Sequence, residues 1–133
     1  MSGRQEPKAF GCPLCFGEDP AAASNHDLKT RSKLIDESHF DVALRRCPAC
    51  GQQFVQIFTE FVDWADGDDP QYWDLLPLTA QEADALATQG TAVDLKQIEE
   101  LGRHRRRLKM DHPKGQPRRV KWATGGLSIY PGH

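Results

Sequence analysis

The chain has 133 residues, a length that suits one compact domain or a small domain with an extension. Apolar residues make up 38% of it, less than the usual figure of about 45–50%. The core should therefore be modest, and a bound metal would contribute substantially to stability. No apolar run approaches the roughly 18 residues of a membrane span, and the first eleven residues lack the apolar core of a signal peptide.

We therefore expect a cytoplasmic protein that makes no contact with a membrane. In reducing surroundings, closely spaced cysteines indicate metal ligands before they indicate disulfides.

The net charge of −2 conceals a strong segregation of charge along the chain. Residues 1–58 are balanced, with seven basic and seven acidic side chains, whereas residues 59–100 carry eleven acids and only Lys96 as a base. Residues 101–133 carry nine Lys or Arg and only Asp111 as an acid. Two interpretations remain open: a basic patch for an anionic partner, or a basic tail that packs on the acidic middle of the chain.

In chain order, residues 1–9 are expected to form a frayed leader. Residues 17–37 are polar and predict a loop, with a weak strand near 29–35. Apolar and polar side chains alternate over 39–46, which is the period of a strand. A β-branched and aromatic run over 53–62 predicts a second strand with both faces covered. The two strands predict a hairpin.

The acidic stretch 63–74 predicts a turn. Thr79 and Glu82 then have the spacing of a capping box, which predicts a helix over 80–88 that ends at Gly90.

A longer helix is predicted over 94–109. It begins at Asp94, and its apolar residues recur at helical spacing while its basic residues gather at the C-terminal end. Residues 120–129 predict a short hairpin around Gly125 and Gly126.

Two cysteine pairs stand in the N-terminal half, as Cys12-Pro13-Leu14-Cys15 and Cys47-Pro48-Ala49-Cys50-Gly51. Thiolates at positions i and i+3 can face one ion, and zinc prefers four soft ligands in a tetrahedron. The second pair lies at the turn of the predicted hairpin, where the following Gly permits a positive φ. The gap of 31 residues between the pairs is longer than the usual 15–20 or so.

All four cysteines take part in this pattern, which predicts one structural zinc ion bound by Cys12, Cys15, Cys47 and Cys50. The alternative is two unrelated reduced pairs or disulfides. A C-x-x-C disulfide would need an oxidoreductase context with a βαβ pattern, which the sequence lacks.

The two C-P-x-C pairs, with a hairpin through the second, resemble zinc-ribbon and rubredoxin-like proteins over residues 10–62. The resemblance implies that the four cysteines are ligands and implies no reaction. Rubredoxins carry iron for electron transfer and have similar pairs, but they are strongly acidic, whereas Arg45 and Arg46 precede the second pair here. Zinc bound by four thiolates has no open position at which to activate water, so its role would be in folding.

A cluster of acids, Asp63, Asp66, Asp68 and Asp69, is faintly similar to a calcium loop but lacks the full motif. We interpret it as a solvated turn. The neighbouring aromatics Trp64, Tyr72 and Trp73 are expected to cap the core rather than to face a partner.

A basic group could bind phosphates, with Trp122 as a stacking platform. Its members are Arg103, Arg105, Arg106, Arg107, Lys109, Arg118, Arg119 and Lys121. The competing interpretation is a solvated helix face, and the pI near 6.2 is low for a dedicated nucleic-acid module. We find no catalytic motif and do not expect an enzyme.

These observations predict an α+β protein with a zinc ribbon at 10–62. Two helices and an irregular basic tail follow within 63–133, packed on the ribbon as one domain. The predicted function is that of a non-catalytic zinc-binding protein, a protein-interaction or adaptor module. Two alternatives remain: a nucleic-acid-associated protein that uses residues 103–121, and a rubredoxin-like iron electron carrier. The oligomeric state stays open.

Overall fold

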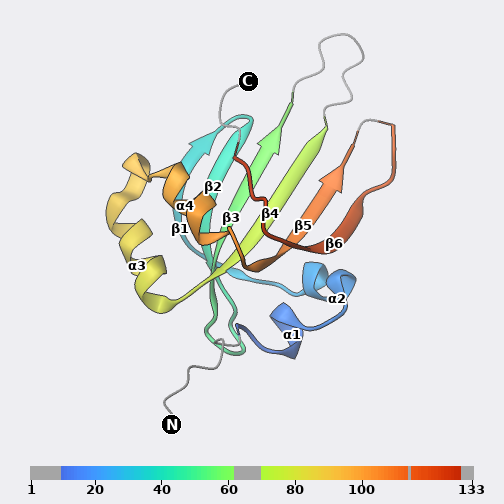
Figure 1. The fold of residues 1–133 in the computed structure, drawn as a ribbon, viewed down its shortest axis with the longest axis horizontal. Coiled ribbons are helices and arrows are strands. Elements are labelled where there is room, and N and C mark those ends of the chain that lie inside the picture. Colours follow the sequence, from blue (N-terminus) through green and yellow to red (C-terminus); the bar gives the residue numbers. More distant parts are fainter. Residues whose placement is uncertain (1–9, 62–69, 114, 130–133) are drawn as a thin grey trace.

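The structure is a computed structural model that describes residues 10–61, 70–113 and 115–129. Its strands form one six-stranded antiparallel sheet in which each strand pairs with the next along the chain (Figure 1). The strands are β1 (Lys29–Glu37), β2 (Phe40–Arg46), β3 (Gln53–Glu60), β4 (Gln71–Leu78), β5 (Arg106–His112) and β6 (Arg119–Thr124). The helices are α1 (Pro13–Phe16), α2 (Pro20–Asn25), α3 (Ala80–Gln89) and α4 (Leu95–Leu101), with a 3-10 turn, η1 (Gly90–Ala92), between the last two.

The predicted hairpin is confirmed. β2 and β3 pair antiparallel from Phe40 opposite Thr59 to Arg46 opposite Gln53, so that the second cysteine pair lies in the turn between them. Side chains of β2 alternate between the two sheet faces. The weak strand expected near 29–35 is also present, as β1.

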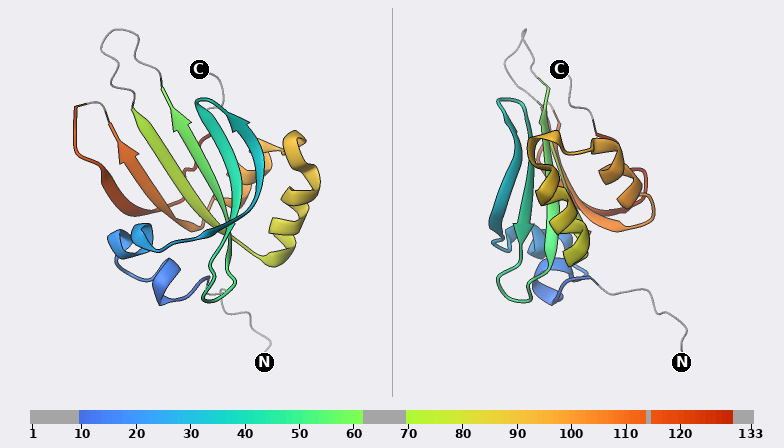
Figure 2. Two further views of the ribbon diagram at one scale, coloured as in Figure 1. Left: turned by 180° about the vertical axis from the view of Figure 1, so that it is seen from behind. Right: turned by 90° about the vertical axis from the view of Figure 1, so that its left-hand side faces the viewer.

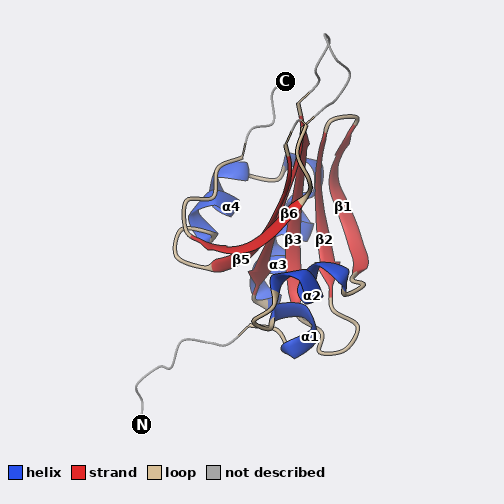
Figure 3. Ribbon diagram, turned by 90° about the vertical axis from the view of Figure 1, so that its right-hand side faces the viewer, coloured by secondary structure: helices blue, strands red, loops and turns tan. Residues whose placement is uncertain are grey.

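A hydrophobic cluster lies on each face of the sheet. α3, α4 and residues 127–129 cover the first face, where they pack on buried side chains of β1 to β4. α1 and α2 pack at one end of the second face, against β5 and β6 (Figures 2 and 3). The second cluster contains two of the cysteines, Cys15 and Cys47. One cysteine of each pair therefore belongs to the core of the second face.

The helix predicted over 80–88 is confirmed as α3. Thr79 Oγ1 accepts a hydrogen bond from Glu82 N, and the Glu82 carboxylate accepts one from Thr79 N, as the capping-box spacing predicted. The helix ends at Gly90, which has a φ of 58°.

The predicted fold class is wrong. We expected a small ribbon followed by two helices and an irregular tail, but the hairpin is part of a larger sheet, with β1 on one side of it and β4, β5 and β6 on the other. The acidic turn expected over 63–74 was wrong for 71–74, which begin β4, a strand with neighbours on both sides. The acidic cluster at 63–69 and Trp64 lie outside the described residues.

The helix predicted over 94–109 is shorter. Asp94 caps α4 as expected, but the helix ends at Leu101, before Gly102. Residues 106–112 are strand β5, in which Leu108 and Met110 face the second cluster. Charged residues alternate with them, which is the period of a strand. In the sequence, the run of basic residues had instead suggested the C-terminal end of a helix.

The hairpin predicted within 120–129 is also wrong. Residues 119–124 form β6, which pairs with β5, and the chain then turns at Gly125 and Gly126, both with positive φ. The segment after this turn crosses the first face, where Leu127 and Ile129 are buried. None of the helices in the described ranges combines the length and the apolar character needed to span a bilayer.

Candidate metal centre

The four cysteine sulfurs lie together at the end of the sheet where β2 turns into β3. Every Sγ atom is within 4.8 Å of the other three. Cys15 Sγ is 3.8 Å from both Cys12 Sγ and Cys50 Sγ, and Cys12 Sγ is 4.0 Å from Cys47 Sγ. A zinc–sulfur bond of about 2.3 Å in a tetrahedron requires sulfurs separated by about 3.8 Å. The arrangement therefore matches a tetrahedral metal site.

Local backbone geometry places each pair. Cys12 is the N-cap of α1, Pro13 occupies the first helical position, and Cys15 lies one turn on, which brings both thiols to one side. In the second pair, Gly51 N donates to Cys47 O at 2.8 Å and closes the turn. Gly51 has a φ of 83°, so the positive φ predicted at this position is confirmed.

Gln52 joins the two pairs. Its Oε1 accepts a hydrogen bond from Gly11 N at 2.8 Å, and its Nε2 donates to Leu78 O at 2.6 Å. Gly11 has a φ of 71°, and a Cβ added there would lie 2.9 Å from Cys15 Sγ. The segment that carries the first pair is thus fastened to the hairpin by a side chain next to the second pair.

His26 is a fifth polar group at the site. Its Nε2 lies 3.2 Å from Cys47 Sγ, within hydrogen-bond distance for sulfur. An N–H directed at a metal-bound thiolate orients the ligand and offsets part of its charge. Cys15 and Cys47 are buried, whereas Cys50 is exposed, so the site lies at the protein surface with two ligands in the core.

The thiols have different proton affinities in the metal-free protein. A hydrogen bond from the Cys15 backbone N–H lowers the pKa of Cys12 to about 7. Burial raises the pKa of Cys15 and of Cys50. A cation that binds all four sulfurs must therefore displace protons.

The donor set determines the chemistry. Four thiolates suit a soft or borderline ion such as zinc or iron, and a closed tetrahedral shell leaves no position for water or substrate. The four sulfurs can hold a metal structurally, and this geometry provides no hydrolytic centre.

The predicted basic group does not lie on one helical face. Arg105 chelates Glu82 through two hydrogen bonds of 2.7 and 2.6 Å, and this contact lowers the pKa of Glu82. Arg107 is buried, and its Nε donates to Asp74 Oδ1 at 2.7 Å. For these two arginines, the interpretation that the basic tail is neutralised by the acidic middle of the chain agrees with the observed contacts.

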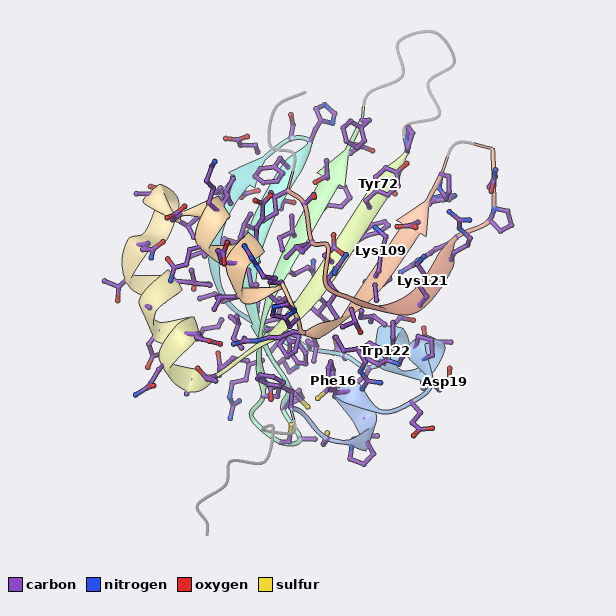
Figure 4. All side chains as sticks on the ribbon, viewed as in Figure 1. Phe16, Asp19, Tyr72, Lys109, Lys121 and Trp122 are labelled. Atoms are coloured by element: carbon purple, nitrogen blue, oxygen red, sulfur yellow. The ribbon has the colours of Figure 1, made fainter. Side chains whose placement is uncertain are left out.

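Arg106 has a different internal role. Its guanidinium lies over both the Phe16 and the Trp122 ring, at 4.2 and 4.0 Å from their centroids, and donates to the carbonyls of Phe16 and Gly17. The two rings also contact each other edge to face, with centroids 4.9 Å apart. Trp122 Nε1 donates to Glu18 O at 3.0 Å. Figure 4 shows Phe16 and Trp122 side by side between α1 and β6. We call Phe16, Arg106 and Trp122 the clamp.

The other members of the basic group are more accessible. Arg103 pairs with exposed Glu100, and Arg118 stacks on Trp73. Lys109 and Lys121 are directly opposite each other on β5 and β6 (Figure 4). Asp111 lies between Lys109 and Arg119, at 3.4 and 3.7 Å. The eight basic residues are therefore divided between the core, both sheet faces and the surface.

The aromatic residues of β4 are half-buried and contact neighbouring rings. Trp73 contacts Phe58 with ring centroids 5.2 Å apart, and Tyr72 contacts Phe61 at 5.7 Å. Sequence reasoning missed two residues of the metal site, His26 and Gln52. A lone His or Gln carries no spacing signal that would have found either of them.

Comparison with protein-family models, curated proteins and solved structures finds no match for this chain.

Proposed function

We propose that this protein binds one zinc ion through Cys12, Cys15, Cys47 and Cys50, and that the ion is structural. The observation that carries the proposal is the set of four sulfurs at tetrahedral spacing. Zinc is favoured over iron because Arg45 and Arg46 directly precede the second cysteine pair in the sequence and His26 contacts Cys47 Sγ, whereas rubredoxins are strongly acidic.

The ion would fasten the N-terminal segment to the sheet. α1 and α2 are short, with four and six residues, and helices of this length are not stable alone. Bound zinc contributes on the order of 10–16 kcal/mol in zinc-finger peptides near neutral pH, which exceeds the net stability of most domains. Metal binding therefore supports the packing of α1 and α2 on the second face.

With its shell closed, the metal leaves the rest of the surface to carry the function. We propose a non-catalytic binding protein, which acts through contacts with a partner as an adaptor or interaction module. Leu14 supports this, because it projects from α1 between two ligands with 54% of its surface exposed. We do not extend the proposal to nucleic acid, because Arg105, Arg106 and Arg107 are engaged in internal contacts.

The test is the metal content and stability of the purified protein, compared with the variant Cys50→Ser. We expect one zinc per chain, and we expect Cys50→Ser to lose the metal and melt at a much lower temperature. Ala49→Ser is the matched control, because it adds the same hydroxyl in the same exposed turn and should keep both properties.

Three outcomes would contradict the proposal. The first is protein without stoichiometric metal, and the second is a fold that is indifferent to a strong chelator. The third is a red protein that contains iron, which would favour the electron-carrier alternative.

A further inference from the structure

Arg45 on β2 is a cation without a counter-ion in the described part of the chain. Its Nη1 donates to Gln56 Oε1 at 2.8 Å, and its Nη2 donates to Leu28 O at 2.7 Å. Its Nε is buried and has no hydrogen-bond partner among residues 10–61, 70–113 and 115–129. Arg105 and Arg107, by contrast, each contact a carboxylate.

This arrangement is costly for the protein alone. A guanidinium stays charged at any physiological pH and offers five donors. The two neutral acceptors at Gln56 and Leu28 use two of these donors and supply no negative charge. An opposite charge nearby stabilises a partly buried charge. An anion from outside the chain would therefore stabilise Arg45.

Arg45 lines a cavity of about 420 Å³ on the second face of the sheet, within the range of roughly 300–1,000 Å³ typical of ligand sites. The floor is apolar and consists of Leu75, Leu108 and Met110. Residues 23–28, from α2 and the chain after it, form the wall. The cavity therefore combines one cation with an apolar surface.

Gln56 adds a donor. Its Oε1 is occupied by Arg45, whereas its Nε2 makes no hydrogen bond to any described residue. Asp27 lies exposed in the wall and disfavours a second negative charge on a ligand. The polar side of the cavity is thus suited to a single anionic group that only accepts hydrogen bonds.

We propose that this cavity binds a small organic monocarboxylate. The carboxylate lies against Arg45, whose planar fork matches its geometry, and accepts a hydrogen bond from Gln56 Nε2. The apolar body of the ligand packs on Leu75, Leu108 and Met110. None of the four cysteines lines the cavity, although His26 lies in its wall and also contacts Cys47 Sγ. The inference therefore goes beyond the proposed zinc function.

The first experiment uses the metal-loaded wild-type protein. Benzoate and hexanoate, with benzamide and hexanol as neutral analogues, are titrated into it and followed by amide NMR shifts. We expect saturable binding of at least one acid, with shifts centred on Leu28, Gln56 and Leu75. The neutral analogue should bind at least about tenfold more weakly than the acid, because it cannot make the charge-assisted hydrogen bond to Arg45.

The second experiment uses Arg45→Gln, which should weaken binding by about tenfold or more. Arg46→Gln is the matched control, because Arg46 is the next residue, is exposed, and points to the other face of the strand. The Arg46→Gln variant should bind the acid as the wild type does. If Arg45→Gln does not fold, the comparison of the acid with its neutral analogue in the wild type still tests the proposal.

Three results would overturn the proposal: no saturable binding of either acid at millimolar concentration, equal binding of the neutral analogue, or an equal loss in Arg46→Gln. Metal content measured on the same samples shows whether the zinc proposal fails independently.

Discussion

The buried pair of Arg107 and Asp74 provides a quantitative test of the fold. The side chain of Arg107 is only 6% exposed, and that of Asp74 is 12% exposed. Arg107→Met removes the 2.7 Å contact to Asp74 and the donor to Gly125 O. Breaking a buried pair in this way leaves an uncompensated charge and costs about 3–5 kcal/mol. In a domain of this size the melting temperature should fall by roughly 10–20 °C.

The assay is urea denaturation and thermal melting of four proteins: wild type, Arg107→Met, Asp74→Asn and the double variant. The double variant should recover much of the loss, because it removes both charges and leaves a neutral amide. Arg103→Met is the control, since Arg103 is exposed and pairs with the exposed carboxylate of Glu100, and should change stability by less than about 0.5 kcal/mol. If Arg107→Met is as stable as the control, the reasoning is refuted.

Three further predictions concern the metal site and α3. Gly11→Ala should weaken metal binding in competition with a chelator, because the new Cβ would lie 2.9 Å from Cys15 Sγ at a φ of 71°. Zinc binding near neutral pH should release two or more protons, because burial raises the pKa of both Cys15 and Cys50; calorimetry in buffers of different ionisation enthalpy measures the number. Glu82→Gln should lower stability above about pH 4.5, and the difference should vanish in acid as the carboxylate, whose pKa Arg105 lowers, gains its proton in the folded state.

Each of these predictions has a control or a contrary result. Gly126→Ala adds a Cβ at a φ of 70° with nothing within 4 Å, so it separates backbone strain from the clash at Gly11. Release of less than one proton per zinc would contradict the assigned thiol pKa values. A Glu82→Gln variant whose deficit persists unchanged in acid would show that the ion pair with Arg105 does not stabilise α3.

Elements with a complete local signal were predictable from the sequence. The β2–β3 hairpin was predicted because apolar side chains alternate over β2, and α3 because both halves of its capping box are present. β4 was missed, because Leu75, Leu76 and Leu78 are apolar on both faces and Pro77 interrupts the pattern. β5 was missed because Leu101 and Leu108 also fit a helical stripe, and its pairing with β4 depends on contacts distant in the sequence.

The candidate sites also differ in whether a local sequence pattern identifies their residues. The metal ligands have a fixed spacing of i and i+3, so the sequence alone predicted that four sulfurs would converge. Arg45, Gln56 and His26 carry no such spacing. Their proximity depends on the strand register of β2 and β3 and on where α2 packs, which only the folded sheet determines.

The clamp has a consequence for the order of folding during synthesis. Trp122 Nε1 and Glu18 O are 104 residues apart in the chain, whereas the cysteine pairs are separated by 31 residues. The four cysteines and the β2–β3 hairpin leave the ribosome well before Trp122, so the proposed metal ion can bind before β6 has been synthesised. The N-terminal segment lacks its contacts with Trp122 until β6 emerges and packs against Phe16 and Arg106. A chain that stops short of residue 122 should therefore bind zinc without completing the second core.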